Sequence, residues 1–166
     1  MFRSDQSHWA VLRNLAISSA AVVVSTAAYY ALPIGLFGIM GTWIFVVAFA
    51  LGLSGVAILI AREVQRYRLG GGASITRVVV SLYLAVLFFA SIYYGLSVHK
   101  PTSITSLTTK TDALYFALSI SSTVGFGDIH AVSQLARAIV TVHMAFNIGY
   151  IGVAVTVLRL PRPRTE

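Results

Sequence analysis

Long apolar runs separated by short polar connectors fill most of the sequence. Four of these runs approach or exceed the roughly 20 residues that a helix needs to cross a bilayer. They are Trp9–Ala31, Leu36–Ala61, Thr76–Leu96 and Gln134–Leu160. The segment Leu32–Gly35 contains Pro33 and predicts a tight turn, so the first two runs should form an antiparallel hairpin. The pattern therefore predicts an all-α integral membrane protein with four transmembrane helices.

A fifth apolar run, Ala113–Val124, is too short to span a bilayer, and its length is typical of a re-entrant or buried helix. Thr109 or Thr111 can cap the start of this helix, and Asp112 suits the positive end of its dipole. The negative end then lies near Ser121 and points at the polar stretch that follows. The run therefore predicts a short helix that enters the membrane and returns.

Composition agrees with a membrane setting and excludes several function classes. Of the 166 residues, 57% are hydrophobic and 10% are charged, whereas an average soluble domain is about 25% charged. The absence of cysteine excludes disulfides, thiolate metal sites and cysteine nucleophiles. The carboxylates are few and scattered, and they form no constellation of nucleophile and base. We therefore expect no enzyme activity and no cofactor.

The positive charges predict the orientation in the membrane. Lys100, Lys110 and Arg137 lie on one predicted side, and the other nine of the twelve cations lie on the opposite side. These nine are Arg3, Arg13, Arg62, Arg66, Arg68, Arg77, Arg159, Arg162 and Arg164. An excess of arginine and lysine marks the cytoplasmic side. We therefore expect a multi-pass protein with both termini in the cytoplasm, in a cell membrane of prokaryotic type.

The runs and connectors divide the chain into four predicted parts. Residues 1–61 form an N-terminal transmembrane hairpin, 62–75 a basic glycine-rich cytoplasmic linker, 76–160 a second membrane domain, and 161–166 a short cytoplasmic tail. Four arginines in or beside the linker either set the topology alone or also bind anionic lipid headgroups. They are Arg62, Arg66, Arg68 and Arg77.

The predicted N-terminal hairpin lacks the signature of a voltage sensor. Such a sensor needs a row of regularly spaced arginines within a span, and neither helix of the hairpin carries one. The small residues Ala48, Gly52 and Gly55 allow neighbouring helices to approach closely. We therefore interpret the hairpin as a packing element.

The stretch SSTVGFGDI, residues 121–129, separates the short helix from the last span. Non-helical backbone at membrane depth is tolerated only where protein buries it or where it lines a water-filled cavity. Gly125 and Gly127 permit positive φ without steric cost. Alternated with Val124 and Phe126, they can turn successive carbonyls to one side. A row of carbonyls next to the negative end of a helix favours a cation and repels an anion.

Residues 123–128, Thr-Val-Gly-Phe-Gly-Asp, resemble the selectivity-filter signature of the potassium channel family, with phenylalanine in place of the usual tyrosine. The resemblance covers Thr76–Leu160 and implies an outer helix, a pore helix, a filter and an inner helix. It further implies that K⁺ is the permeant ion and that the filter residues bind it. These residues are Thr123, Val124, Gly125, Phe126 and Gly127. One such loop cannot enclose an ion, so a homotetramer is implied.

The resemblance also implies which residues support the filter. Asp128 would brace its outer mouth, and Tyr115 and Phe116 would form a cuff around it. Ser119 stands where some bacterial members carry a carboxylate that pairs with the filter aspartate. Asn147 stands where many members carry a hinge glycine, so Gly149 and Gly152, which follow it, predict a displaced hinge.

The last span offers two faces that could line the pore. One stripe at helical spacing is apolar in its lower half and, by the resemblance, lines the conduction path as a gate that excludes water. It consists of Thr141, Met144, Ile148, Ile151 and Val155. The alternative turns the face of His143 and Asn147 inward and gives a wet cavity. A third reading has these two side chains hydrogen-bonded to each other at a helix or subunit interface.

We therefore predict a subunit of a potassium-selective channel that conducts K⁺ passively. Two alternatives stay open: a weakly selective cation channel, and a non-conducting subunit of a larger channel assembly. The expected partners are further copies of the chain and membrane lipids, and not nucleic acid.

Overall fold

The computed structural model describes residues 5–33, 51–52, 54–55, 58, 62, 65 and 75–159. Within them, the elements follow in the order α1 (Asp5–Ala31), α3 (Ile75–His99), β1 (Ile104–Thr105), α4 (Lys110–Ser121), β2 (His130–Ala131) and α5 (Gln134–Arg159). Most of the second predicted span, Leu36–Ala61, lies outside these residues, as do most of the linker 62–75 and the whole tail 161–166.

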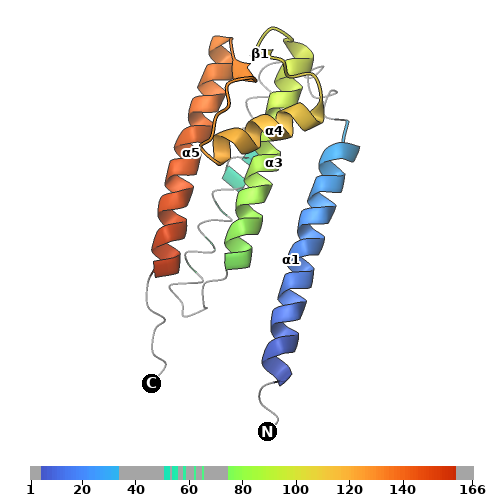
Figure 1. The fold of residues 1–166 in the computed structure, drawn as a ribbon, viewed down its shortest axis with the longest axis vertical. Helices are drawn as coiled ribbons and strands as arrows, with labels where there is room; N and C mark the ends of the chain where they lie inside the picture. The colour runs from blue at the N-terminus through green and yellow to red at the C-terminus, as the bar shows by residue number, and fades with distance from the viewer. Residues whose placement is uncertain are drawn as a thin grey trace.

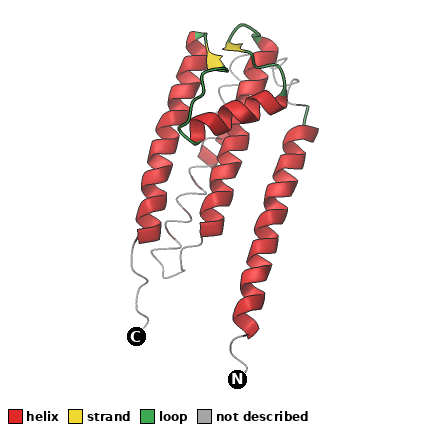
Figure 2. Ribbon diagram, viewed as in Figure 1, coloured by secondary structure: helices red, strands yellow, loops and turns green. Residues whose placement is uncertain are grey.

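Three helices, α1, α3 and α5, lie with their axes roughly parallel, and the short helix α4 lies across them near one end (Figure 1). The first residues of α1 and the last residues of α5 lie toward the opposite end. The loops that flank α4 gather at the α4 end (Figure 2). Residues 122–129, which follow α4 and are called the glycine-containing stretch below, therefore lie at the same end as α4.

Two helices among the described residues are long and apolar enough to cross a membrane. They cover Thr76–His99 of α3 and Gln134–Gly152 of α5, and a shorter apolar helical stretch covers Leu15–Ala31 of α1. Three of the four predicted spans are therefore confirmed as helices. The fourth falls largely outside the described part of the chain.

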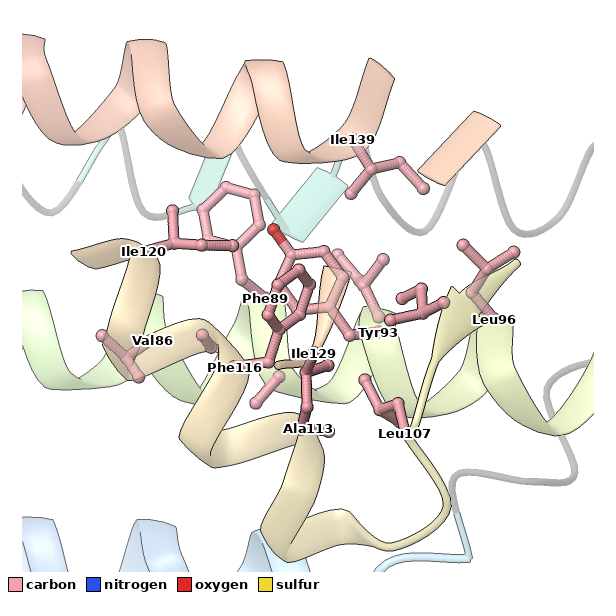
Figure 3. Packing of buried hydrophobic residues seen from close by; sticks show 14 of the residues in the cluster. Val86, Phe89, Tyr93, Leu96, Leu107, Ala113, Phe116, Ile120, Ile129 and Ile139 are labelled. Atoms are coloured by element: carbon pink, nitrogen blue, oxygen red, sulfur yellow. The ribbon is translucent and has the colours of Figure 1, made fainter. Parts of the chain in front are cut away.

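The buried core lies where α3 meets α4 and α5 (Figure 3). Phe89 and Tyr93 of α3 are fully buried, and the Tyr93 ring packs against Phe116 of α4 with 4.8 Å between ring centroids. Ile120 of α4 and Ile139 of α5 belong to the same cluster. Lipid is as apolar as these side chains, so burial alone does not hold membrane helices together. Close packing of large rings and buried hydrogen bonds must do so.

Gly52 lies so close to α3 that a side chain there would have to displace the Phe88 ring. A Cβ added there would lie 2.0 Å from the Phe88 ring, well inside van der Waals contact. At Gly55, by contrast, no atom of the described residues comes within 4 Å of an added Cβ. The predicted close approach is therefore confirmed at Gly52 and not at Gly55, and Ala48 lies outside the described residues.

Strands β1 and β2 tie the loop before α4 to the segment after the glycine-containing stretch. They pair antiparallel, with Ile104 opposite Ala131 and Thr105 opposite His130. The Ser103 carbonyl beside them accepts the N–H groups of Val132 and Ser133 at 2.9 and 3.2 Å. The sequence pattern does not predict these strands, because two residues are too few to show alternation.

Helix α4 begins and ends three residues earlier than the predicted run Ala113–Val124. Its N-cap is Thr109, which was one of the two residues predicted for this role. The Thr109 hydroxyl accepts the Asp112 N–H at 3.1 Å. In return, the Asp112 carboxylate accepts the N–H groups of Thr108 and Thr109 at 3.0 and 2.7 Å. The start of α4 is earlier because the cap residues are polar and fall outside the apolar run.

We predict that Thr109→Ala lowers the unfolding temperature of the detergent-solubilised protein. The loss of an N-cap hydroxyl typically costs about 1 kcal/mol of stability. Thr102→Ala, in the loop between α3 and α4 and exposed, is the matched control and should leave the midpoint unchanged. An equal midpoint for the wild type and Thr109→Ala would contradict the cap.

This cap should also respond to acid. The Thr109 N–H, which donates to the Asp112 carboxylate, lowers the pKa of that group below its ordinary value. The ionised carboxylate therefore stabilises the folded protein above its unfolded-state pKa, and this contribution is lost as the pH falls through the lowered folded-state pKa. The difference in unfolding temperature between the wild type and Asp112→Asn should accordingly shrink as the pH falls through that range.

Candidate functional site

The backbone of residues 123–127 alternates between left-handed and ordinary conformations. Thr123, Gly125 and Gly127 have φ values of 60°, 55° and 84°. Positive φ at the two glycines confirms the sequence prediction. Positive φ at Thr123 was not predicted, because a β-branched residue adopts it only when the surrounding structure holds it there.

The carboxyl end of α4 keeps Thr123 in this conformation through hydrogen bonds. The Ser119 carbonyl accepts the N–H groups of Val124 and Gly125, each at 3.1 Å, and the Ile120 carbonyl accepts the N–H of Thr123 at 3.1 Å. The last carbonyls of a helix have no partner within the helix, so the stretch and the helix end satisfy each other. The first part of the stretch is thereby fixed against the negative end of α4.

A second set of contacts holds the far end of the stretch. The Tyr115 hydroxyl of α4 donates to the Asp128 carboxylate at 3.0 Å, and the Tyr115 and Phe126 rings stack with 5.9 Å between centroids. The His130 Nδ1 lies 3.0 Å from the Gly127 carbonyl oxygen. Tyr115 and Asp128 therefore lie together at the stretch, where the resemblance implies supporting roles for them.

Phe116 lies on the other side of α4. It is buried against Tyr93, whereas its neighbour Tyr115 is exposed beside Phe126. Within one chain, the structure therefore brings Tyr115 to the stretch and leaves Phe116 in the core between α3 and α4. Ser119, where some family members carry a carboxylate, is buried, and its hydroxyl donates to the Phe116 carbonyl at 2.9 Å.

The stretch is open to its surroundings in the single chain. All residues from Thr123 to Asp128 are exposed, and the large side chains of Val124 and Phe126 are exposed by 56% and 67%. A single chain therefore leaves this stretch exposed and does not enclose it.

Helix α5 separates into a buried face and an exposed face. The predicted pore-lining residues lie on the exposed face, and Ile148 is the most exposed of them at 75%. These residues are Met144, Ile148, Ile151 and Val155. His143 and Asn147 lie on the buried face, packed inside the chain. The helix continues unbroken through Gly149 and Gly152, and a Cβ added at either glycine would meet no atom within 4 Å.

His143 joins three helices through both of its ring nitrogens. Nδ1 lies 3.0 Å from the Tyr93 hydroxyl of α3, and Nε2 lies 3.0 Å from the Ser121 hydroxyl at the end of α4. Its ring stacks on Phe89 with 3.8 Å between centroids. A neutral imidazole has one donor and one acceptor, so both hydroxyl groups can be satisfied at once. Helix α5 is thereby bonded to Ser121, the last residue of α4.

The predicted hydrogen bond between His143 and Asn147 is wrong. His143 bonds to Tyr93 and Ser121 instead, because these hydroxyls come from neighbouring helices that periodicity along α5 does not reveal. Asn147 is 4% exposed, and its side-chain amide has no hydrogen-bond partner among the described residues.

The arginines predicted to bind lipid headgroups are only partly described. Arg62 and Arg77 are exposed, while Arg66 and Arg68 lie outside the described residues. Lipid binding by these arginines stays a prediction.

Residues 81–159 match the family model described as "Ion channel". The matched range begins in α3, contains α4 and the glycine-containing stretch, and ends with α5. Searches among curated proteins and among solved structures found no match. The match and the two candidate membrane helices support an ion-channel function and a membrane location, and α1 lies outside the matched range.

We predict that His143→Phe destabilises the protein although a phenylalanine can still stack on Phe89. The Tyr93 and Ser121 hydroxyls would lose their shared partner in the interior, which typically costs about 1–3 kcal/mol. Thermal unfolding of the solubilised protein measures the loss. His99→Phe, at an exposed position at the end of α3, is the control, and equal midpoints for the two variants would show that the buried bonds contribute nothing.

Proposed function

We propose that the chain is the subunit of a potassium-selective channel, in which four copies surround a central filter formed by residues 123–127. The observation that carries this proposal is the alternation of positive φ at Thr123, Gly125 and Gly127, directly after the carboxyl end of a short helix. The match of residues 81–159 to an ion channel family supports it independently.

The proposed mechanism is replacement of the hydration shell of K⁺ by protein oxygens. Carbonyl groups of Thr123, Val124, Gly125 and Phe126, together with the Thr123 hydroxyl, would bind the ion as water leaves it. The negative end of α4 adjoins the inner end of this stretch and favours a cation there. Conduction is passive and needs no bond to form or break.

The exposure of the stretch supports the proposed fourfold assembly. One row of carbonyls leaves an ion open on its other sides, whereas four rows around an axis surround it. The same assembly would cover Val124 and Phe126. In this arrangement, Asp128 and Tyr115 brace the outer mouth, and the exposed face of α5 lines the path below the filter.

The proposed membrane orientation places α4 and the filter toward the outside. The starts of α1 and α3 and the end of α5 would then face the cytoplasm, where the arginine excess belongs. Arg62, Arg66, Arg68 and Arg77 would lie at the headgroups of the inner leaflet, where anionic lipids attract them.

Potassium flux from liposomes that contain the purified protein tests the proposal, and Gly125→Ala should abolish this flux. A Cβ at φ of +55° is strained whatever space surrounds it, and such backbone conflicts cost about 1 kcal/mol or more in each subunit. Gly55→Ala is the matched control, because an added Cβ meets no atom there either. Normal potassium-selective flux from Gly125→Ala would overturn the filter assignment.

The two alternatives predict different results in the same assay. A weakly selective cation channel would pass Na⁺ about as readily as K⁺ under bi-ionic conditions. A non-conducting subunit would show no flux from the wild-type chain alone, and size-exclusion chromatography would show no tetramer.

We predict that Ile151→Asn or Val155→Asn raises basal potassium flux. Both side chains lie on the exposed face of α5, where rings of apolar residues would exclude water from the path, and a polar side chain would hydrate it. Asn147→Leu is the control, since Asn147 lies on the buried face. If only Asn147→Leu changed the flux, the pore-lining face would be the other one.

A further inference from the structure

The ammonium group of Lys110, the first residue of α4, binds the carboxyl end of α1. Its Nζ donates to the carbonyl oxygens of Tyr29, Tyr30 and Leu32 at 3.1, 2.7 and 2.7 Å. A lysine ammonium has three donors, and all three are used. The last carbonyls of α1 have no partners within their own helix, so Lys110 supplies partners to a helix far away in the sequence.

The bonding also runs in the opposite direction. The hydroxyl of Tyr29, which is buried, donates to the Lys110 carbonyl at 2.7 Å. The Tyr30 hydroxyl lies 3.1 Å from Oγ1 of Thr111. Nζ also lies 5.9 Å from the centroids of the Tyr29 and Tyr94 rings, within the range of a cation–π contact. Side chains of each helix therefore bind backbone groups of the other.

The position of Lys110 is unfavourable for α4 itself. A cation in the first turn of a helix faces the positive end of the helix dipole, where an acid such as Asp112 is favoured. At the carboxyl end of α1, the same charge is favourable. The charge of Lys110 is thus unfavourable for α4 and favourable for α1. This indicates that Lys110 acts in the contact between the two helices.

Helix α4 can transmit this contact to the filter. It is a single capped helix of 12 residues, and its other end binds Val124 and Gly125 through the Ser119 carbonyl. A displacement at Lys110 must therefore move the helix end that holds these two residues, or break the hydrogen bonds that connect them.

We propose that Lys110 is a positioning residue through which α1 sets the placement of α4 and hence the geometry of the filter. This inference rests on the proposed function, since it assigns to α1 an effect on ion selection. Helix α1 lies outside the range matched by the ion channel family, so the chain would carry its own external support for the pore helix.

Hydrogen exchange of the full-length protein in detergent tests the coupling without requiring conduction. In Lys110→Met, which keeps a long apolar side chain but lacks the ammonium, the amides of Val124 and Gly125 should exchange faster than in the wild type. We expect roughly twofold to fivefold, the range that a charge at a helix end supports. Lys110→Arg should stay closer to the wild type, because it keeps the cation.

Two further variants complete the test. Lys100→Met removes an exposed lysine from the loop after α3, and the described residues show no side-chain hydrogen bond for it, so exchange should not change. Tyr29→Phe removes only the hydroxyl that binds the Lys110 carbonyl, and it should raise exchange at Val124 and Gly125 in the same direction. If Lys110→Met does not fold, the exchange rates of this milder variant test the proposal instead.

Faster exchange confined to the end of α1, at residues 28–33, would overturn the proposal, because Lys110 would then only cap α1. In liposomes, Lys110→Met tetramers should lose part of the preference for K⁺ over Na⁺, an effect that lower stability alone does not produce. Unchanged selectivity would overturn the effect of α1 on ion selection. A wild-type protein without flux would instead refute the proposed function, and the exchange data would still decide the coupling.

Discussion

Backbone groups in apolar surroundings need hydrogen-bond partners, and the structure around α4 is organised by this constraint. At its amino end, Thr109 and Asp112 cap the helix. At its carboxyl end, the Ser119 carbonyl accepts two N–H groups from the glycine-containing stretch. The carboxyl end of α1 meets the same requirement through Lys110. The short helix and the irregular stretch therefore keep their positions because each helix end supplies hydrogen-bond partners to the backbone of another segment.

Buried polar side chains add specificity to packing that apolar contacts alone do not define. Between membrane helices, most apolar surfaces are interchangeable with lipid. His143 can be satisfied only where Tyr93 and Ser121 both reach it, and its ring lies flat on Phe89. Such a group permits few arrangements of α3, α4 and α5, since any shift leaves a buried polar atom without a partner. The helix that carries the exposed apolar face is thus fixed in rotation by its opposite face.

Local features were predictable from the sequence, and contacts between distant segments were not. The N-cap at Thr109 and positive φ at Gly125 and Gly127 depend on residue type and immediate neighbours, and the structure bears them out. The partners of His143 and Lys110 depend on which helices lie side by side, which a single sequence does not encode in its periodicity. Positive φ at Thr123 belongs to the same class, because the carboxyl end of α4 imposes it.

The range that matches the ion channel family is smaller than the unit that the hydrogen bonds define. The match begins at residue 81, whereas α4, inside it, exchanges hydrogen bonds with Tyr29 and Tyr30, outside it. Thr26 of α1 also bonds to the Tyr83 hydroxyl of α3, 2.8 Å away. Removing α1 would leave the Lys110 ammonium without its three carbonyl partners, at the first turn of a helix where a cation is disfavoured. By this physical criterion, α1 belongs to the same structural unit as the stretch that α4 supports.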